Sequence, residues 1–551
     1  KLNFINWDRL DVLNANDGYE YIVTNVGTIL DDVVPEKTVI IPFSKIIREP
    51  WMTDGLMKSS AERDKLYRKC IGLDKNHDKY KKFVSYRNKF NSLKRTARQK
   101  YYSDKIKEFR HNSQRLWKIL NSMIGKHNDK GLPTDSFNID GKTVTDPHTI
   151  SNSFCNFYST NSKKLADNIP NSNKNFQDYL GEPVGESIFF EPTDENEIEK
   201  YIKSLPNKTS SGYDSISNII VKGLSGVLRE PLCKVFNNSM SEGKFPDKMK
   251  IAEITPVYKS KEKNMQSNYR PISLLPVLSK VLEKIIYKRV YSFLMQHNVL
   301  YTSQYGFRTE HSTIQAITEL VGNIVKGFEE KKITLGLFLD LSKAFDTLKH
   351  STLLAKLEHY GIRGTPLNWF TSYLTDRKQY VKYNGVKSDF NKTRLEYGVP
   401  QGSVLGPLLY LIFCNDIYKC IKHCKTILFA DDTTIYVTHE NLNQLFIYMK
   451  QDFANVVDWF RANKLSVNLS KTNYIIFRPR NMTIQNLDEF NLSFGNTVIK
   501  RVDVSKFLGI FVDSNLNWNS HVEHVCSQVS KSLYILRSVK KCLPKWVLKM
   551  L

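Results

Sequence analysis

The sequence predicts an α+β fold in which acidic residues lie at strand ends and amphipathic helices cover the sheet. Two strand-like apolar runs lead into aspartates, one into Asp340 and the other into the pair Asp431-Asp432. Apolar residues recur with helical spacing in two long stretches, 277–294 and 442–460. Strands and helices with such apolar faces pack as layers around a shared core.

The length and charge of the chain indicate several domains and a polyanionic partner. With 551 residues, the chain exceeds one typical core, so two to four domains are expected. The net charge of +24 favours a partner rich in phosphates, which Lys and Arg side chains neutralise. The charge is concentrated in residues 58–130, where 22 Lys and Arg outnumber 7 Asp and Glu, a net charge of +15.

The cysteines are typical of a reducing compartment. All eight lie at irregular spacing, which argues against a secreted disulfide scaffold. Cys420, His423 and Cys424, with Cys414 nearby, suggest a zinc site, but no second Cys/His pair follows at ligand spacing, so reduced structural cysteines are expected. No apolar run reaches transmembrane length, and we expect no membrane partner. Because the chain opens at Lys1 and not Met, we expect a piece of a longer protein.

The first 192 residues are predicted to contain three regions. Residues 1–57 mix Asp- and Asn-rich turns with short apolar runs, and residues 126–192 are rich in turn formers and predict a loosely structured connection. Between them, residues 58–125 predict basic helices with interleaved aromatic residues. Such helices fit a nucleic-acid surface, and equally an amphipathic helical pair with an aromatic seam and a solvated basic face.

The pair Asp431-Asp432 is predicted to occupy the turn of a β-hairpin. Strand-length apolar runs flank it within residues 425–437. Three carboxylates at strand ends, with Asp340 as the third, can hold two Mg²⁺ ions, which prefer oxygen ligands. The alternative is a solvated acidic turn, and the dipeptide alone does not decide between them.

The order of the remaining motifs identifies a resemblance. Residues 335–346 are followed by a glycine-rich loop at 397–407 and then by Phe-Ala-Asp-Asp at 429–432. This order resembles the palm of reverse transcriptases, most closely those of non-LTR retrotransposons (LINE-type, jockey/CR1-like). The resemblance covers residues 195–551 and extends to four further segments, 268–274, 303–308, 468–472 and 507–511.

The resemblance implies a right-hand polymerase with fingers, palm and thumb, preceded by a mainly helical, basic N-terminal extension. Residues 1–57 are then a linker following a missing endonuclease, and residues 58–192 are the basic extension with its loose connection. Residues 193–513 correspond to the fingers and palm. Residues 514–551 correspond to the start of the thumb, which is cut short.

The resemblance also implies two-metal nucleotidyl transfer. Asp340 and Asp431 would bind both Mg²⁺ ions, with Asp432 supporting and Mn²⁺ as a substitute. A primer 3′-hydroxyl then attacks the α-phosphorus of a dNTP in line, and pyrophosphate leaves.

Five further residues are implied to contact the incoming nucleotide. Lys259 and Arg270 would clamp the triphosphate, although their simplest alternative is an ordinary surface pair. Gln401 would line the dNTP pocket, and Lys471 would protonate the leaving pyrophosphate. Phe345, five residues after the first aspartate, would exclude a ribose 2′-hydroxyl and so select dNTPs. Asp346 is interpreted as a structural turn acid outside the metal site.

Template and primer contacts follow from the same resemblance. Tyr305, Phe307 and Arg308 match the segment near the template, and Phe507, Leu508 and Gly509 match the primer-positioning hairpin. The implied partners are an RNA template, a DNA primer and dNTPs, and the implied location is the nucleus, with cytoplasmic ribonucleoprotein assembly as an open alternative. The oligomeric state, the host and the target site stay open.

Two alternatives to a non-LTR RNA-directed DNA polymerase are kept. A catalytically inactive or domesticated nucleic-acid-binding relative would be expected to have lost an acid, whereas Asp340, Asp431 and Asp432 are all present. A group II intron maturase-type reverse transcriptase differs chiefly in what would follow Leu551. A retroviral enzyme fits less well, because Phe-Ala-Asp-Asp and the basic extension suit LINE-type chains better.

Overall fold

The computed structural model describes residues 1–35, 49–124, 134–391, 395–482, 490–494, 497–540, 543 and 545–550. The chain divides into two compact units. Unit 1 comprises Lys1–Pro35 and Gly131–Trp518, and unit 2 comprises Glu36–Lys130 and Asn519–Leu551. These divisions differ from the boundaries expected at 57, 192 and 513, because the first 35 residues belong to unit 1 and the last 33 residues join residues 36–130 in unit 2.

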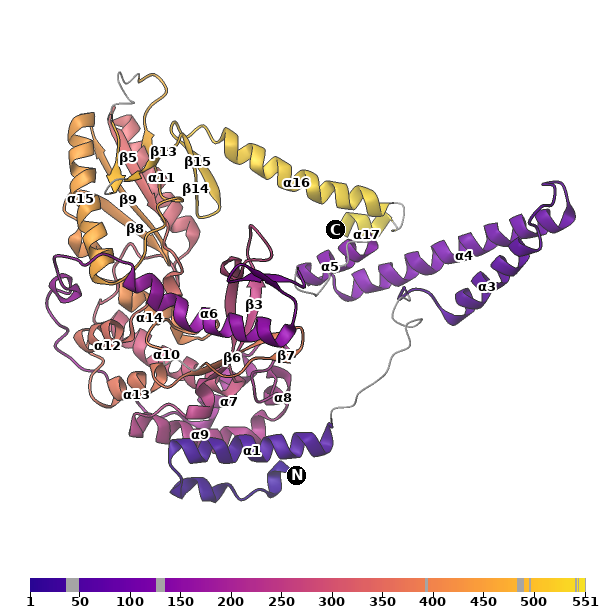
Figure 1. Cartoon of the computed structure of the whole chain (residues 1–551), viewed down its shortest axis with the longest axis horizontal. Helices are drawn as coiled ribbons and strands as arrows, with labels where there is room; N and C mark the ends of the chain where they lie inside the picture. Colours follow the sequence, from indigo (N-terminus) through magenta and orange to yellow (C-terminus); the bar gives the residue numbers. More distant parts are fainter. Residues whose placement is uncertain are drawn as a thin grey trace. The chain divides into compact units, whose positions relative to one another are not determined.

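Unit 1 contains a five-stranded sheet (Figure 1), and the bounds of its strands place the three aspartates at strand ends. Its strands, in spatial order, are β13 (Lys500–Arg501), β10 (Asn473–Phe477), β5 (Ile333–Leu339), β9 (Asp432–His439) and β8 (Lys425–Phe429). Strands β5, β8 and β9 pair antiparallel, and β8 and β9 form the predicted hairpin. All seven residues of β5 are buried, as expected for a strand covered on both faces.

Helices cover both faces of this sheet. On one face, α15 (Leu442–Ala462) packs against the side chains of Leu335 and Leu337. On the other face, α11 (Thr313–Glu329) packs against Phe338 and Tyr436. Neighbouring strand residues point to opposite faces, which explains why Leu337 and Phe338 belong to different clusters. The predicted helical stripes form α15 and α10 (Val277–Gln296), so this part of the prediction is confirmed.

A second sheet in unit 1 has the order β4-β3-β6-β7. Its strands are β3 (Ile251–Tyr258), β4 (Tyr269–Leu274), β6 (Lys378–Tyr383) and β7 (Val386–Lys387). Helix α6 (Pro147–Asp167) covers it, with Phe154 fully buried against Tyr269 and Phe137. Phe137 lies in a small hairpin of β1 (Phe137–Ile139) and β2 (Lys142–Val144). The expectation of a loosely structured connection is therefore wrong for residues 137–167, because their apolar side chains close a distant sheet.

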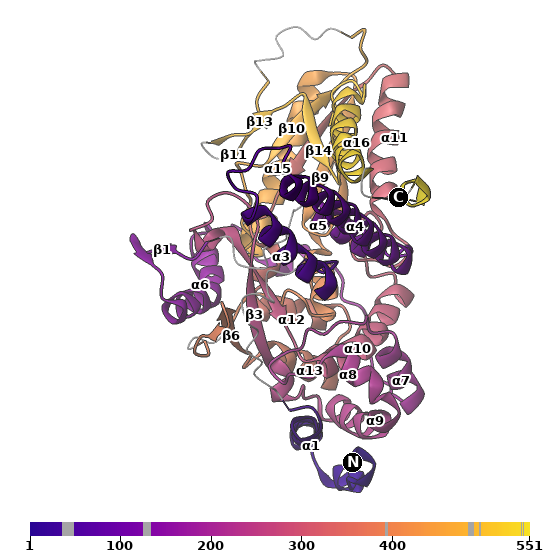
Figure 2. The same ribbon diagram turned by 90° about the vertical axis from the view of Figure 1, so that its right-hand side faces the viewer.

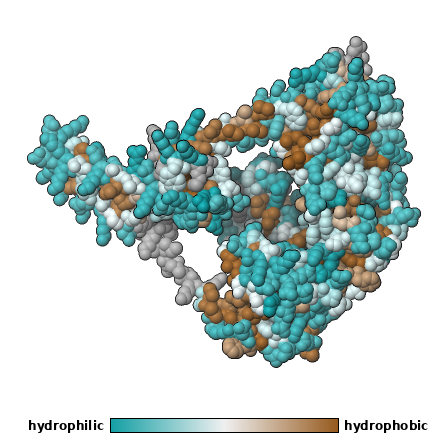
Figure 3. Space-filling view, turned by 180° about the vertical axis from the view of Figure 1, so that it is seen from behind, coloured by the Kyte–Doolittle hydropathy of each residue, from teal (hydrophilic) through white to brown (hydrophobic). Residues whose placement is uncertain are grey.

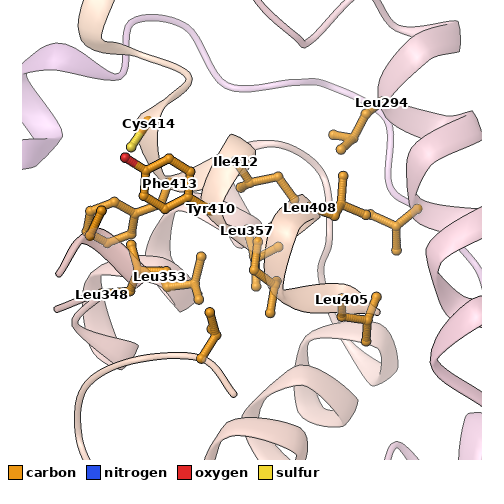
Figure 4. Packing of buried hydrophobic residues seen from close by; sticks show 14 of the residues in the cluster. Leu294, Leu348, Leu353, Leu357, Leu405, Leu408, Tyr410, Ile412, Phe413 and Cys414 are labelled. Atoms are coloured by element: carbon orange, nitrogen blue, oxygen red, sulfur yellow. The ribbon is translucent and has the colours of Figure 1, made fainter. Parts of the chain in front are cut away.

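The remaining core of unit 1 is helical. Its helices are α7 (Glu195–Lys203), α8 (Asn218–Gly223), α9 (Ser225–Glu242), α12 (His350–His359), α13 (Thr365–Leu374) and α14 (Leu405–Cys414). Figure 4 shows side chains of α14, including Leu405 and Leu408, among leucines of α12 and α10. Nine of the ten residues of α14 are buried, so this helix fixes the loop that precedes it.

The N-terminal segment is not a simple linker. Helix α1 (Ala15–Val33) lies beside α9 (Figure 2), and its Tyr19 and Ile22 side chains are fully buried in the main core. Its N-terminus is capped by Asn14, whose side chain accepts hydrogen bonds from the N–H groups of Asn16 and Asp17. The linker interpretation is therefore wrong for residues 15–33.

Unit 2 is helical and combines two segments that are distant in sequence, Glu36–Lys130 and Asn519–Leu551. It contains α3 (Asp54–Arg68), α4 (Asp78–Glu108), α5 (Ser113–Met123), α16 (Asn519–Val539) and α17 (Lys545–Met550). Trp51, Tyr102 and Ile106 share a buried cluster with Val539 and Val547. The thumb segment and the basic extension, which were expected to be separate domains, thus have a common core.

The basic helices have an aromatic seam and a charged exterior. Phe83 and Phe90 of α4 are buried, and Phe83 contacts Tyr67 of α3 at a ring-centroid distance of 5.3 Å. Helix α4 carries eleven Lys and Arg against three Asp and Glu, a net charge of +8. The arm formed by α3 and α4, on the left in Figure 3, has a mostly hydrophilic surface. The expected aromatic seam between two helices with a solvated basic surface is therefore present.

Two hairpins complete unit 1, β11 (Ser493–Phe494) with β12 (Thr497–Val498) and β14 (Val504–Phe507) with β15 (Ile510–Asp513). Among the helices described, none combines the length and the apolar character needed to cross a membrane.

Candidate active site

The turn that presents Asp431 is held from outside the hairpin. Phe429 pairs with Asp432, so Ala430 and Asp431 form the turn, and Ala430 adopts a left-handed conformation with φ of 55°. The Gln304 Oε1 atom accepts hydrogen bonds from the N–H groups of Ala430 (3.3 Å) and Gly306 (2.9 Å). A conformation that is unfavourable for alanine persists when its surroundings fix it in this way.

A glycine lets the neighbouring segment approach this turn. A Cβ atom at Gly306 would lie 2.2 Å from the Ala430 nitrogen, which no side chain can tolerate. Both Gln304 and Gly306 lie in the segment 303–308 that was assigned to the template. The sequence resemblance identified this segment. It did not predict that the segment supports the acidic turn, because that role depends on a contact between residues that are distant in sequence.

Asp340 lies beside the acidic hairpin. Leu339 pairs with Thr433, so the next residues outward, Asp340 and Asp432, are neighbours at the ends of β5 and β9. The Asp340 carbonyl accepts a hydrogen bond from the Asn468 N–H group at 2.8 Å. This contact orients the segment 468–472, and the Lys471 Nζ atom donates to Asp340 Oδ2 at 3.0 Å. Two motifs that were predicted to act together are thus in direct contact.

The three carboxylates interact electrostatically. Desolvation is the largest cause that raises the pKa of Asp432 to about 6, and the charges of Asp431 and Asp340 raise it further. The nearby Lys471 ammonium acts in the opposite direction. Like charges held this close destabilise the ionised state and are relieved by a cation.

The donor set fits Mg²⁺ that is partly held by a substrate. Within the described part of the chain, no group of three or more His, Cys, Asp or Glu side chains is arranged to hold a metal ion. Mg²⁺ typically takes one or two carboxylates together with water and substrate phosphates, and dedicated protein cages are not its usual site. The mutually repelling carboxylates of Asp340, Asp431 and Asp432 would supply part of the coordination of Mg²⁺, and water and substrate phosphates would supply the rest.

Two predicted cations lie near the aspartates. Lys259 and Arg270 come from neighbouring antiparallel strands, since Val257 pairs with Arg270 and the Lys259 N–H group donates to the Asn268 carbonyl at 2.9 Å. Burial lowers the pKa of Lys259, and the positive charges of Arg270 and Lys471 lower it further. The charges of Asp340 and Asp431 act in the opposite direction. The charges of residues from four segments that are distant in sequence thus act on one another.

The glycine-rich loop is fixed on two sides. The Gly398 N–H group donates to the Leu348 carbonyl (2.8 Å), and the Ser273 N–H group donates to the Gln401 carbonyl (2.8 Å). Gly398 (φ 85°) and Gly402 (φ 129°) both require glycine. A Cβ atom at Gly398 would lie within 3 Å of the Asp346 carbonyl oxygen, and one at Gly402 would lie within 3 Å of the Ser273 carbonyl oxygen. The loop therefore has little freedom to move.

Gln401 is bonded to the acid that was excluded from the metal site. Its Nε2 atom donates to Asp346 Oδ1 at 2.7 Å. The two residues line a cavity of about 70 Å³, whose described lining does not include the three aspartates. This cavity is therefore not the metal site. Asp346 is a buried hydrogen-bond acceptor beside the loop, consistent with its interpretation as a structural acid.

A buried acid fixes the other end of the loop. The Glu283 Oε2 atom accepts hydrogen bonds from the N–H groups of Val404 (2.7 Å) and Leu405 (3.1 Å) at the start of α14. A carboxylate at a helix N-terminus satisfies otherwise unpaired donors and faces the positive end of the helix dipole. Sequence reasoning missed Glu283, although an acid on a helix with so much apolar surface was a signal.

Phe345 lies between two other aromatic rings. It stacks on Tyr410 with ring centroids 4.8 Å apart and contacts Phe307 edge-on at 5.8 Å. The charges of Asp431 and Asp432 are among the causes that raise the pKa of Tyr410, after its burial. Tyr410 therefore links Phe345 to the neighbourhood of the aspartates.

The residues assigned to template and primer fall into two groups. Phe307 and the turn residues Leu508 and Gly509 are at least partly accessible. In contrast, Tyr305 donates to Glu319, and the Arg308 Nη1 atom donates to the Tyr301 carbonyl at 2.7 Å, so these side chains are engaged within the protein.

Phe507 belongs to the second group. Its side chain is only 4% exposed and packs against Phe338 at 5.8 Å. Because a buried ring cannot contact a primer, Phe507 anchors the β14–β15 hairpin, whereas the Lys506 side chain and the tip of the hairpin are accessible.

The cysteine cluster has a structural environment. The Asp452 carboxylate accepts hydrogen bonds from the N–H groups of Lys422, His423 and Cys424. Burial is the largest cause that raises the pKa of the Cys420 thiol to about 12. A thiol with a raised pKa resists the deprotonation that zinc binding requires.

The chain is similar in sequence to known proteins. The sequence profile of the family described as reverse transcriptase (RNA-dependent DNA polymerase) matches residues 259–512. The probable RNA-directed DNA polymerase from transposon BS of Drosophila melanogaster is 29% identical over 377 residues, which are 65% of this chain and 40% of that protein.

Two further Drosophila melanogaster proteins are similar. The probable RNA-directed DNA polymerase from transposon X-element is 28% identical, over 66% of this chain and 40% of that protein. The RNA-directed DNA polymerase from mobile element jockey is 27% identical, over 63% of this chain and 38% of that protein. The chain thus spans about two fifths of the length of these relatives.

Proposed function

Because residues 259–512 of this chain match the reverse transcriptase family and the chain is similar to polymerases of transposon BS and mobile element jockey, we propose that it copies RNA into DNA. It joins dNTPs to a primer 3′-hydroxyl on an RNA template. The observation that carries this proposal is the meeting of Asp340, Asp431 and Asp432 with the cations Lys259 and Lys471, which come from separate segments.

The acidic and the basic residues have different roles in phosphoryl transfer. Asp340 and Asp431, supported by Asp432, would hold Mg²⁺, which when bound would neutralise phosphate charge and activate the primer hydroxyl. Lys259 and Arg270 bind the triphosphate and orient its α-phosphorus for in-line attack. Lys471, which already contacts Asp340, is within reach of the same phosphates and supplies a proton to the departing pyrophosphate.

The Phe345 ring selects the sugar of the incoming nucleotide. Stacking on Tyr410 and the edge contact with Phe307 restrict the Phe345 ring to one position. A ring fixed in this way leaves no room for a 2′-hydroxyl to settle beside it. We therefore propose dNTPs as substrates, with discrimination by steric exclusion.

The two sheets and the helical unit take the roles of a right-hand polymerase. We assign the five-stranded sheet to the palm, the β4-β3-β6-β7 sheet to the fingers and α16 to the start of the thumb. Helix α4, with its net charge of +8, binds nucleic-acid phosphates. The site of action is the nucleus, where a DNA primer is available.

Primer extension tests this proposal. The protein is incubated with poly(rA)/oligo(dT), dTTP and Mg²⁺, and we expect incorporation that EDTA abolishes and that Mn²⁺ restores. UTP in place of dTTP should be incorporated at least about 100-fold less efficiently, because the sugar is excluded sterically. Phe345→Ala should reduce that ratio.

Two results would contradict the proposal. Equal use of UTP and dTTP by the wild-type protein would contradict the role of Phe345. Binding of the primer–template without any extension would favour the alternative of a non-catalytic nucleic-acid-binding relative.

A further inference from the structure

The side chain of Gln401 has one strong hydrogen-bond partner. Its Nε2 atom donates to Asp346 Oδ1 at 2.7 Å, a short distance for an amide donor. Asp346 ends a short 3-10 helix, Ala344–Asp346, which also contains Phe345. One bond therefore connects the loop that carries Gln401 with the segment that carries the sugar-excluding ring.

The chemistry of this bond fixes which end of the amide faces outward. An ionised carboxylate can only accept hydrogen bonds, so the amide nitrogen of Gln401 must face Asp346. The amide oxygen, Oε1, then points away from Asp346, and no donor among the described residues is bonded to it. Without the carboxylate, the two ends of the amide are nearly interchangeable, because the terminal torsion of glutamine is broad.

Asp346 is itself well fixed. Its N–H group donates to the Lys343 carbonyl at 2.8 Å, and the neighbouring Phe345 carbonyl accepts from the Val399 N–H group at 3.0 Å. The close approach of Gly398 leaves no space for the Asp346 backbone to shift. Burial raises the pKa of Asp346, while the bond from Gln401 and the charge of Lys343 favour its ionised form.

We propose that Asp346 is a positioning residue for nucleotide addition. It sets the orientation of the Gln401 amide so that Oε1 is presented to a hydrogen-bond donor of the incoming nucleotide. The donors of a dNTP lie on its sugar and base, since its phosphate oxygens only accept. Asp346 therefore directs Gln401 to the nucleoside part of the substrate. This inference rests on the proposed polymerase function and on the placement of Gln401 in the nucleotide site.

A double-mutant cycle tests the inference. KM for dTTP and kcat are measured on poly(rA)/oligo(dT) for Asp346→Ala, Gln401→Leu and the double variant. We expect each single substitution to raise KM by roughly 10-fold, the effect of losing one buried hydrogen bond, while kcat changes by less than about 2-fold. The double variant should be no worse than Gln401→Leu, because Asp346 acts only through Gln401.

Two further variants separate positioning from general stability. Asp346→Asn should restore KM to within about 3-fold of the wild-type value, because its amide oxygen still accepts from Gln401 Nε2. Asp452→Ala is the matched control, since Asp452 is a fully buried acid that binds backbone N–H groups elsewhere. It should lower Tm and leave KM for dTTP unchanged.

The outcomes are distinguishable. If the double variant shows the product of the two single effects on KM, or if Asp346→Ala lowers Tm without changing KM, the positioning role is overturned. In both cases an active wild-type protein leaves the polymerase function intact. A wild-type protein that extends no primer would overturn that function, and this inference with it.

Discussion

Single residues determine how the acids are presented. The Asp431 turn depends on Ala430 in a left-handed conformation, on the Gln304 amide oxygen and on the absence of a side chain at Gly306. None of these residues is acidic or basic. The position of the acids therefore depends on contacts made by residues that carry no charge.

Gly306→Ala should displace the acidic turn. The added Cβ atom would lie 2.2 Å from the Ala430 nitrogen, so the turn or the 303–308 segment must move. We expect incorporation to fall by at least about 100-fold, since a displacement of about 1 Å can cost that much in rate. The free energy of unfolding should fall by about 1–3 kcal/mol. Gly322→Ala is the control, because open space surrounds Gly322 on α11. Wild-type activity of Gly306→Ala would show that the turn does not need this close approach.

The raised pKa of Asp432 predicts a pH-dependent cost to stability. Its ordinary pKa is 3.8 and its pKa in the folded protein is about 6. Between these values the folded protein binds more protons than the unfolded chain, so the contribution of Asp432 to stability falls as the pH rises from about 4 to about 6.

Asp432→Asn removes this cost. In EDTA we expect Tm to rise at pH 7.5 by about 1–2 °C, a small value because Asp432 is solvent-accessible, and to rise less at pH 4.5. Differential scanning calorimetry measures both values. A lower Tm for the variant at pH 7.5 would contradict the repulsion among the three carboxylates.

Some helices and strands could be predicted from the sequence, whereas contacts between elements that are distant in sequence could not. The β8–β9 hairpin, β5, α10 and α15 followed from local patterns, because their apolar residues repeat within one element. The contacts from α6 to the second sheet, from Gln401 to Asp346 and from Glu283 to α14 join residues that are distant in sequence. No periodicity reports such contacts, so the physical setting of Gln401 and the importance of Glu283 could be found only in three dimensions.

Glu283→Ala should destabilise the start of α14. It leaves the N–H groups of Val404 and Leu405 without their acceptor and creates a cavity, for which we expect a loss of about 3 kcal/mol in the free energy of unfolding. Glu283→Gln keeps an acceptor oxygen and should cost much less. Chemical denaturation compares the two variants. If Gln is as harmful as Ala, the hydrogen bonds to α14 do not explain the burial of Glu283.

At the scale of the whole molecule, the C-terminal segment shares a core with residues that lie more than 400 positions earlier in the sequence. Val539 and Val547, near the C-terminal end, share one buried cluster with Trp51, Tyr102 and Ile106. The resemblance predicted a thumb and a basic extension as successive domains, and sequence order gave no reason to expect a common core. Their joint core implies that neither segment is stable alone.

Val547→Asp should unfold unit 2 selectively. Val547 is fully buried, and an unpaired charge at such a position is strongly destabilising. We expect calorimetry to show a lower or absent transition for unit 2 and an unchanged transition for unit 1. Val525→Asp, at an exposed position on α16, is the control. A single shared transition that shifts as a whole would contradict the division into two units.

The central claim is that Asp431 is a ligand of the catalytic metal in an RNA-directed DNA polymerase. The most direct measurement is dTTP incorporation on poly(rA)/oligo(dT) by Asp431→Ala beside Asp458→Ala, which removes a half-buried acid of α15 that pairs with Arg461. We predict that Asp431→Ala folds with a normal Tm and loses at least about 1,000-fold in activity, because metal-assisted charge stabilisation supplies several kcal/mol of the rate. Asp458→Ala should retain wild-type activity. Incorporation by Asp431→Ala at the rate of Asp458→Ala would contradict the account.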